Sequence, residues 1–416
     1  MSLRCGSALG ALALLLTSLR PAAAEPSYRF DGSISRQVLE NYLSRSITMA
    51  EMYRSPGSMD DDLRMLKNIG AKFIGRSIYL WGGEARIVDP KFLAQGREMA
   101  DRVHKIDPDV VLQACAFEIV TEAVNQVPVP DWVFQEFGLP AEKRNFSYTK
   151  MLFPDGKMVN HWRQGSSVPD INQPETKMWF GYLVGSYMEI GIEAIHFGQL
   201  DLMGRDDPEN RAWADLFRHV RSLAAKKARR RYLICDAHTP KGGPIVDGRL
   251  LLDFHSFPLR PKEVADTPLK AVLEIGYSDG LYRRSRGGIA PSGWKCEHLP
   301  YLVEFDNFGG NRTPGQSTQS KGANIFTWGY DEITWFSHQP EDYRNEWLRY
   351  AWKWLKDNDP DGFLEMPGGR MITNGPVTTD GTKLTWYFAN TKSDAFPRGF
   401  SQEETIKAIW KADRRN

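Results

Sequence analysis

Short runs of apolar and β-branched residues alternate with amphipathic segments along most of this 416-residue chain. Runs of this kind, near-continuous in apolar residues, are typical of parallel strands that are buried on both faces. We therefore predict eight strands. They begin at Ser46, Lys72, Val110, Ile192, Tyr232, Leu250, Tyr301 and Asn324.

The segments between these runs carry helix signals. Ser58 precedes "MDDDLRMLKNI", whose first turn is acidic, and Gly70 follows the last apolar position as a C-terminal cap. Pro90 and Pro208 open two further helical patterns, and "PEDYRNEWLRYAWKWLKD" carries an aromatic stripe at helical spacing. Eight strands alternating with helices predict a (β/α)8 barrel. An open doubly wound sheet is less well supported, because no G-x-G-x-x-G follows a strand.

The two ends of the chain differ from this pattern. Residues 1–24 combine an early Arg4, the apolar run "ALGALALLLTSL" and a small-residue ending, which is typical of a secretory signal peptide. We therefore expect a secreted or periplasmic protein whose barrel spans residues 25–365. Residues 366–416 contain two strand-like runs around "TTDGT" and a short helix, and are predicted as a small β appendage.

Composition excludes some classes of partner. The net charge is +1, with 41% hydrophobic residues, so there is no electrostatic case for binding nucleic acid or an anionic membrane. Three cysteines remain after the signal peptide, Cys115, Cys235 and Cys296, which allow at most one disulfide. Cys115 and Cys235 lie inside apolar runs and are predicted as buried small hydrophobes.

Polar and aromatic residues follow seven of the eight predicted strands. In a (β/α)8 barrel these strand ends meet at one face, where active sites form. Glu304 and Asp306 are two residues apart on the seventh strand, so their side chains point the same way. The sequence therefore predicts one cavity lined by acids, imidazoles and aromatic rings. The residues concerned are Trp81, Glu84, Glu118, His196, Gln199, Asp201, Asp236, His238, Asp253, His255, Glu304, Asp306, Trp328, Tyr330 and Asp331.

Two carboxyl groups facing a sugar are the catalytic groups that cleave a glycosidic bond in most glycoside hydrolases. The chain resembles the (β/α)8-barrel glycoside hydrolases of the large retaining clan, in which the nucleophile ends strand seven, as Glu304 does. The resemblance implies a general acid after an Asn on strand four, where this chain has "HFGQLD" instead. The acid is therefore Asp201 or Glu118.

We predict Glu118 as the general acid and Glu304 as the nucleophile or base, without a metal or other cofactor. The substrate is expected to be a poly- or oligosaccharide. Its contacts are predicted at Trp81, His196, Gln199, Asp201, Asp236, His238, His255, Asp306, Trp328 and Tyr330.

Three alternatives remain open. "DAH" and "DFH" on strands five and six, with Asp331, resemble the metal ligands of amidohydrolase barrels, although "SITMAEMY" lacks the His-x-His of their first strand. A polysaccharide lyase would need a cation beside a uronate. A non-catalytic sugar-binding barrel would use the same carboxylates only as hydrogen-bond acceptors. The candidate cations for a lyase are Arg76, Arg163, Arg283, Arg284 and Arg286.

Overall fold

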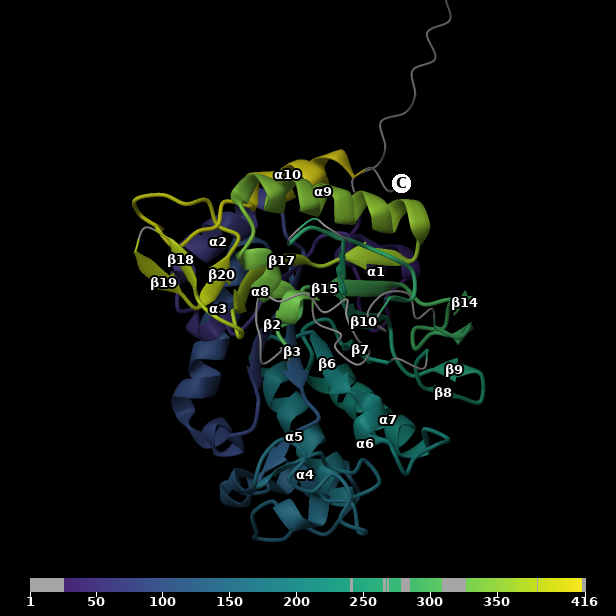
Figure 1. Cartoon of the computed structure of the whole chain (residues 1–416). Helices are drawn as coiled ribbons and strands as arrows, with labels where there is room; N and C mark the ends of the chain where they lie inside the picture. Colours follow the sequence, from purple (N-terminus) through teal and green to yellow (C-terminus); the bar gives the residue numbers. More distant parts are fainter. Residues whose placement is uncertain are drawn as a thin grey trace, which may run out of the picture.

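A computed structural model describes residues 26–239, 242–264, 267, 269–277, 285–308, 327–379 and 381–413 of the chain (Figure 1). The predicted signal peptide, Arg283 and Arg284 lie outside these residues. Among the described residues, no helix combines the length and apolar character that crossing a bilayer requires.

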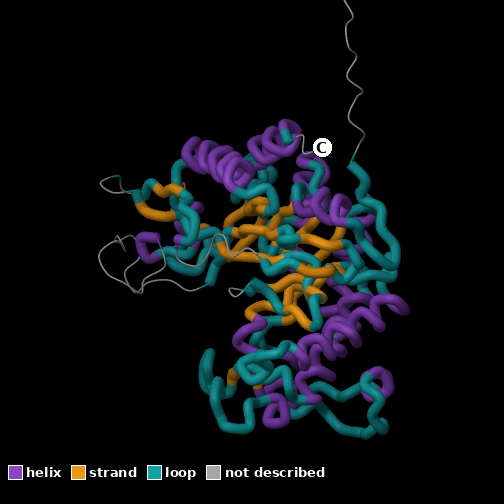
Figure 2. Tube along the Cα trace, turned by 90° about the vertical axis from the view of Figure 1, so that its right-hand side faces the viewer, coloured by secondary structure: helices purple, strands orange, loops and turns teal. Residues whose placement is uncertain are grey.

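A curled sheet of ten strands occupies the centre of the molecule, with helices outside it (Figure 2). Seven of the predicted strands are confirmed. They neighbour one another in chain order and pair in parallel, as the barrel class requires. These strands are β1 (Ser46–Met49), β2 (Phe73–Leu80), β3 (Val111–Ala116), β6 (Ala194–Gln199), β7 (Ile234–His238), β10 (His255–Pro258) and β15 (Tyr301–Glu304).

The two ends of this seven-strand series are joined by a later segment. β16 (Gly362–Leu364) pairs in parallel with β15, and β17 (Met366–Met371) pairs in parallel with β1. Glu365 lies between the two strands, and its backbone N–H donates to the carbonyl oxygen of Val303 at 2.8 Å. The predicted (β/α)8 class is confirmed, with residues 362–371 in the place of the eighth strand.

The prediction of an eighth strand at Asn324 was wrong over its described part. Residues 327–329 form a short 3-10 helix, η6 (Thr327–Gly329), and α8 (Glu332–Ser337) follows, while residues 324–326 lie outside the described residues. The boundary predicted at residue 366 consequently falls inside the main sheet. The rest of the predicted appendage comprises a hairpin, an edge strand and a helix: β18 (Val377–Thr379), β19 (Thr382–Leu384), β20 (Trp386–Phe388) and α10 (Glu403–Ala412).

The main helices follow the predicted signals. The hydroxyl of Ser58 accepts from the backbone of Asp61, and Gly70 ends the helix in the left-handed region at φ 74°. The predicted aromatic helix is also present, and it lies beside α10 (Figure 1). The helices of the barrel are α1 (Arg36–Leu43), α2 (Met59–Ile69), α3 (Pro90–Ile106), α5 (Pro174–Glu189), α7 (Arg211–Lys227) and α9 (Glu341–Asn358).

Two long connections add small elements to the barrel. The first lies between β3 and α5 and forms the lobe at the lower end of Figure 1. It contains β4 (Val120–Thr121), η3 (Glu122–Gln126), α4 (Asp131–Glu136), η4 (Tyr148–Met151) and β5 (Ser166–Ser167). The second connection, between β7 and β15, contributes, besides β10, the short strands β8 (Ile245–Val246), β9 (Arg249–Leu250), β11 (Lys262–Glu263), β12 (Ala271–Val272), β13 (Gly288–Ile289) and β14 (Lys295–Cys296). The remaining short helices are η1 (Met52–Arg54), η2 (Glu84–Val88) and α6 (Leu200–Met203).

The inside of the barrel consists of two layers of opposite character. A buried apolar cluster includes one residue at the start of most of the strands, and α1 packs against it. Two residues further along each strand, on the same face, the side chain is polar or absent. The pairs are Phe73 and Gly75, Val111 and Gln113, Ala194 and His196, Ile234 and Asp236, Phe254 and Ser256, Leu302 and Glu304, and Phe363 and Glu365.

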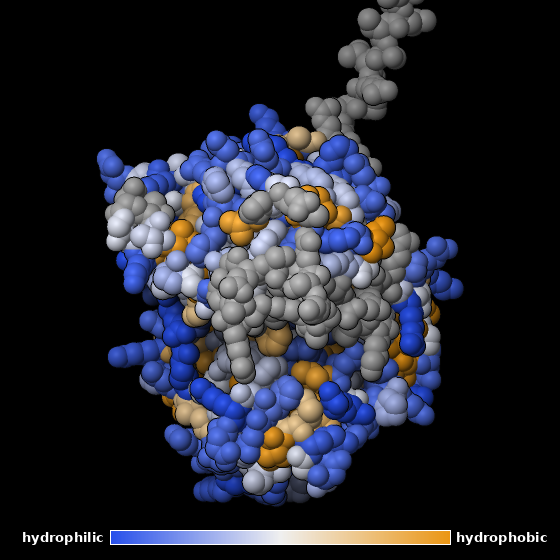
Figure 3. Space-filling view, in the orientation of Figure 1, coloured by the Kyte–Doolittle hydropathy of each residue, from blue (hydrophilic) through white to orange (hydrophobic). Residues whose placement is uncertain are grey.

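The cysteines and the surface agree with the composition. Cys115 and Cys235 are buried, as predicted, Cys296 is half-buried, and all three are free thiols. Hydrophilic side chains dominate the described part of the face in Figure 3, where apolar residues are scattered.

Candidate functional site

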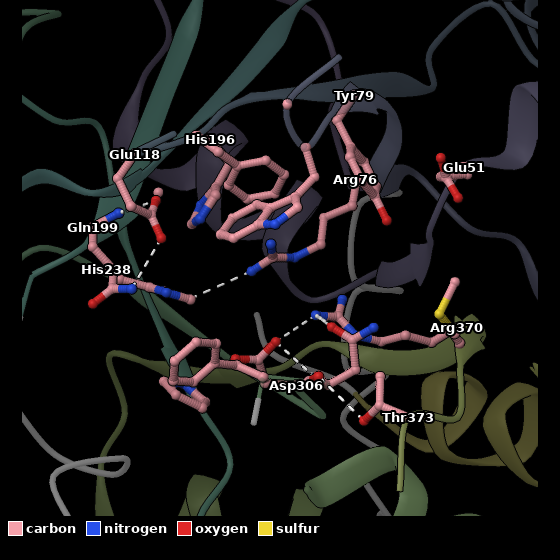
Figure 4. Close-up of a pocket in the computed structure, with 18 of the residues that line it drawn as sticks. Glu51, Arg76, Tyr79, Glu118, His196, Gln199, His238, Asp306, Arg370 and Thr373 are labelled. Carbon is pink, nitrogen blue, oxygen red and sulfur yellow. Dashed lines mark hydrogen bonds and ion pairs between the residues drawn. The ribbon is translucent and has the colours of Figure 1, made fainter. Parts of the chain in front are cut away.

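A cavity of about 790 Å³ opens above the polar layer, at the carboxyl ends of the strands (Figure 4). Its described lining combines six aromatic rings with acids, arginines and histidines. The rings are Tyr79, Trp81, Phe117, Trp162, Phe257 and Phe308. The charged and titratable groups are Glu51, Glu118, Asp306, Arg54, Arg76, Arg86, Arg260, Arg370, His196 and His238.

The structure brings six of the twelve predicted site residues into this lining: Trp81, Glu118, His196, Gln199, His238 and Asp306. Two more, Glu304 and Asp236, lie directly behind the wall and hydrogen-bond to residues of the lining. The catalytic pair predicted from the sequence is therefore divided between the wall and the layer beneath it.

The other four predicted residues lie outside the described lining. Asp201 is in α6, and the buried ring of His255 contacts the hydroxyl of Thr239. Trp328 and Tyr330 belong to the segment wrongly predicted as a strand, which removes the reason for placing them at the cavity. Their rings stack on Trp335 at 6.2 Å and on His338 at 4.9 Å.

Glu118 follows β3 and faces the cavity with only 3% of its surface exposed. Its Oε2 accepts from the backbone N–H of Gln199 and its Oε1 accepts from the Gln199 side-chain amide, both at 2.9 Å (Figure 4). Gly198 permits this approach, because a Cβ at that position would lie 1.9 Å from Oε2. No ion pair between Glu118 and a cation occurs in the described part of the chain, so its donors are neutral amides.

Arg76 enters the cavity through a distortion of β2. Its φ of 57° is in the left-handed region, and the register with β3 shifts between Ile74 and Ile78. A side chain other than glycine in this region is strained, and such strain is concentrated at functional sites. The guanidinium binds Glu304 through two bonds: Nε donates to Oε2 at 2.8 Å, and Nη2 donates to Oε1. The sequence offered no signal for this placement.

Glu304 is held by side chains from three elements, β2, β7 and β17. Besides Arg76, the ring of His238 lies 2.7 Å from Oε1, and Nη1 of Arg370 lies 3.5 Å from Oε2. Burial alone would raise the pKa of Glu304, but Arg76, His238 and Arg370 hold that pKa well below its usual value. Glu304 is therefore an ionised carboxylate whose two oxygens are already occupied.

Asp306 is the carboxylate of this strand end that reaches the cavity. Its Oδ1 accepts from Arg370 of β17, which also lines the cavity (Figure 4). Burial would raise the pKa of Asp306, but the positive charge of Arg370 lowers it below its usual value. Asp306 is consequently ionised at neutral pH and faces the cavity.

His196 lines the cavity, and one nitrogen of its ring has no hydrogen-bond partner among the described residues. Its Nδ1 lies 2.8 Å from Oδ2 of Asp236. The same oxygen accepts from Ser256 at 2.9 Å, and Oδ1 of Asp236 accepts from Gln113 at 2.7 Å. Burial, followed by the charge of Arg76, holds the pKa of His196 well below its usual value, so the ring is neutral. With the proton on Nδ1, Nε2 is an acceptor, and it has no hydrogen-bond partner among the described residues.

Glu365, in the polar layer, gives a testable pH dependence. Its Oε1 accepts from the hydroxyl of Ser46 at 3.2 Å. Burial, followed by the charge of Glu304, raises the pKa of Glu365 from 4.5 to about 7. An acid with a raised pKa ionises more readily in the unfolded chain, so the free energy of unfolding should fall as pH rises from about 4.5 to about 7.

We expect the free energy of unfolding of Glu365→Gln to fall less over this pH range than that of the wild-type protein, because a glutamine carries no charge at either end of the range. The measurement is the free energy of unfolding, from urea denaturation at about pH 5 and about pH 8. Burial also raises the pKa of Asp236 to about 7, so a residual slope of the same sign should remain in the variant. Equal slopes in the wild-type protein and the variant would contradict the prediction.

The metal-dependent alternative lacks a ligand cluster. No group of three or more His, Cys, Asp or Glu side chains that could hold a metal ion occurs within the described ranges. Of the residues that suggested this alternative, Asp331 caps α8 by accepting from the backbone of Thr334. His238 contacts Glu304 instead of converging with His255 and Asp331 on one point.

The chain is similar to some known proteins in structure but not in sequence. No protein-family model matches the chain, and no curated protein gives a significant sequence match. Similar solved structures include an α-galactosidase from Thermus thermophilus, at 14% identity and a TM-score of 0.33, over 53% of this chain and 45% of that chain. An α-amylase from Lactobacillus plantarum has 10% identity and a TM-score of 0.32, over 52% of this chain and 53% of that chain.

A third similar structure is a GH2 β-galacturonidase from Eisenbergiella tayi, at 12% identity and a TM-score of 0.40, over 89% of this chain and 51% of that chain. This chain thus spans about half the length of the solved structures it matches. They are glycoside hydrolases, the class that the sequence resembles. At these identities and TM-scores, the likeness assigns no role to any residue of this chain.

Proposed function

We propose that this protein hydrolyses a glycosidic bond in the cavity, with Glu118 as the proton donor. The observation that carries the proposal is a pair of carboxyl groups in the cavity lining in opposite electrostatic settings. Among the described residues, Glu118 has neutral amide partners and no cation, whereas Asp306 pairs with Arg370. Glycosidic hydrolysis requires this division between a carboxylic acid that donates a proton and a carboxylate that stays ionised.

The second carboxylate is Asp306 in this proposal, and not Glu304 as the sequence suggested. Glu304 is absent from the described lining, and Arg76 and His238 occupy its oxygens. Asp306 lies two residues further along the chain and lines the cavity. We therefore assign Glu304 the role of positioning Arg76 and His238 beneath the substrate.

The reaction adds one water molecule across the bond. Glu118 gives its proton to the leaving oxygen as the bond from that oxygen to the anomeric carbon breaks. The positive charge that develops at the anomeric carbon is stabilised by Asp306, which acts as nucleophile or as base for water. Water supplies a hydroxyl group to the anomeric carbon, and its remaining proton restores the carboxyl group that gave one up.

The aromatic wall provides the surface for a sugar ring. Trp81, which is 44% exposed, contacts Phe117 and Trp162 at ring-centroid distances of 5.1 and 5.2 Å. The indole N–H of Trp162 donates to the carbonyl oxygen of Glu118 at 3.0 Å, so the wall is tied to the proton donor. Apolar rings suit the faces of sugars, and Nε2 of His196 can accept from a hydroxyl group.

The test is the fate of labelled water. Purified protein is incubated with a panel of poly- and oligosaccharides in water enriched in ¹⁸O, and the products are examined by mass spectrometry and ultraviolet absorbance. We expect new reducing ends that carry one ¹⁸O. Unlabelled products with the absorbance of a new double bond would establish a lyase instead. Glycan binding without any product would establish a binding protein.

A further inference from the structure

The cavity lining contains more arginines than hydrolysis of a neutral sugar requires. Five line the cavity, and no lysine is found in its described lining. Four of the five pair with a carboxylate: Arg54 with Glu51, Arg76 with Glu304, Arg260 with Glu332, and Arg370 with Asp306. The fifth, Arg86, differs from the others.

Arg86 lies in η2, beside the end of β2. Its Nη2 donates to the hydroxyl of Tyr53 at 2.5 Å, and its guanidinium carbon lies 5.3 Å from the ring centroid of Phe92. No carboxylate lies within ion-pair distance of Arg86 among the described residues. A guanidinium group carries five N–H donors, so most of those of Arg86 are available to a ligand.

Arg86 and Glu118 are complementary in this respect. Among the described residues, Glu118 has no cation partner and Arg86 has no carboxylate partner. Of the five arginines in the described lining, Arg86 is therefore the one whose charge is not paired with a described carboxylate. A negative charge on the substrate would supply the missing partner.

We infer that the cavity takes a sugar carrying a carboxylate, a uronic acid residue, whose two oxygens accept hydrogen bonds from Arg86. The inference rests on the proposed function, since it places the uronate ring between Trp81 and Glu118. The planar fork of arginine matches a carboxylate through two parallel bonds, which a lysine does not offer. A sulfate ester carries the same charge and is separated from the uronate by the experiment.

The experiment is calorimetric binding to the wild-type protein and to Arg86→Gln. The ligands are methyl glucuronides and galacturonides of both anomers, each compared with the neutral methyl hexoside of the same configuration and with its 6-sulfate. We expect at least one uronide to bind the wild-type protein about tenfold or more tightly than its neutral partner, as hydrogen bonds to a charged group allow. Arg86→Gln should abolish this preference, so that the uronide binds no more tightly than its neutral partner.

Two further variants keep the test decisive. Arg86→Lys retains the charge without the fork, and should recover less than the full preference. Arg249→Gln makes the matched change at an exposed arginine and should leave all affinities unchanged. Thermal unfolding of each variant checks that it is folded. Equal wild-type affinities for uronides and neutral hexosides would overturn the inference, as would tighter binding of the 6-sulfates.

Failure of this inference and failure of the proposed function are distinguishable. Binding is measured without turnover, so a preference for uronides that depends on Arg86 would stand even if no labelled product formed. Conversely, hydrolysis of neutral and acidic glycans at equal rates would overturn the uronate inference and leave the hydrolase proposal in place.

Discussion

Replacing Glu118 by glutamine is expected to lower kcat on an alkyl glycoside by about 10²- to 10⁴-fold. A glutamine cannot donate a proton to the leaving oxygen, and general acid catalysis contributes about this factor. The shape of the side chain is retained, and one of the two hydrogen bonds to Gln199 survives. The effect on the free energy of unfolding should therefore be small, about 1 kcal/mol for the hydrogen bond that is lost.

Substrates with different leaving groups distinguish a proton donor from a residue that only shapes the cavity. A 4-nitrophenyl glycoside leaves as a stable anion and needs little protonation, so Glu118→Gln should retain much more of its activity on this substrate. Glu122→Gln is the matched control, because Glu122 is exposed in the same connection and loses the same charge. Equal losses on alkyl and nitrophenyl glycosides would contradict the role of Glu118 as the acid.

Some strands of the barrel could be predicted from the sequence and others could not. The first seven are apolar runs because both of their faces are buried, and this pattern predicted them. In β17 the pattern is broken by Pro367, Gly368 and Gly369. A Cβ at Gly368 would lie 2.5 Å from the sulfur of Met49 and 2.6 Å from a backbone oxygen of β1, so close packing excludes the side chains that mark a strand.

The cavity wall was predictable where it depends only on the position of strand ends. That reasoning placed Glu118, His196 and His238 correctly, because each follows or ends a parallel strand. It did not distinguish Glu304 from Asp306, because both point the same way and their depth depends on the stagger of the neighbouring strands. That stagger is a property of how the strands pair in the sheet and not of any single run.

Arg76 was named as a candidate cation for a lyase, but the pairing of Arg76 and Arg370 with the acids at the end of β15 was missed, for two different reasons. Arg76 is turned toward Glu304 by a backbone in the left-handed region, and the hydrophobic periodicity of a sequence does not predict such a conformation. Arg370 lies in β17, which the sequence assigned to a separate appendage. These ion pairs therefore escaped prediction, although they determine which of the two acids, Glu304 or Asp306, is available to a substrate.

Replacing Glu304 by glutamine is expected to lower the free energy of unfolding by about 3–5 kcal/mol, the typical result of removing one partner from a buried ion pair. Glutamine has nearly the same shape, but it leaves Arg76 and Arg370 in the barrel without their shared counter-charge. Urea denaturation at neutral pH measures the effect. Glu297→Gln, at an exposed position before the same strand, should change the free energy by no more than about 0.5 kcal/mol.

A second change distinguishes this positioning role from that of a nucleophile. Adding Arg76→Met to Glu304→Gln removes a buried cation that has lost its counter-charge, so the double variant should be more stable than Glu304→Gln alone.

The stabilising effect of Glu304 should also depend on pH. In the wild-type protein the pKa of Glu304 is lowered on folding, so the stabilisation by Glu304 is present above about pH 4.5 and is lost as pH falls through the folded-state pKa. Glu304→Gln should not show this loss in the free energy of unfolding at acidic pH. Unchanged stability in Glu304→Gln, together with complete loss of hydrolysis, would instead identify Glu304 as the nucleophile that the sequence suggested.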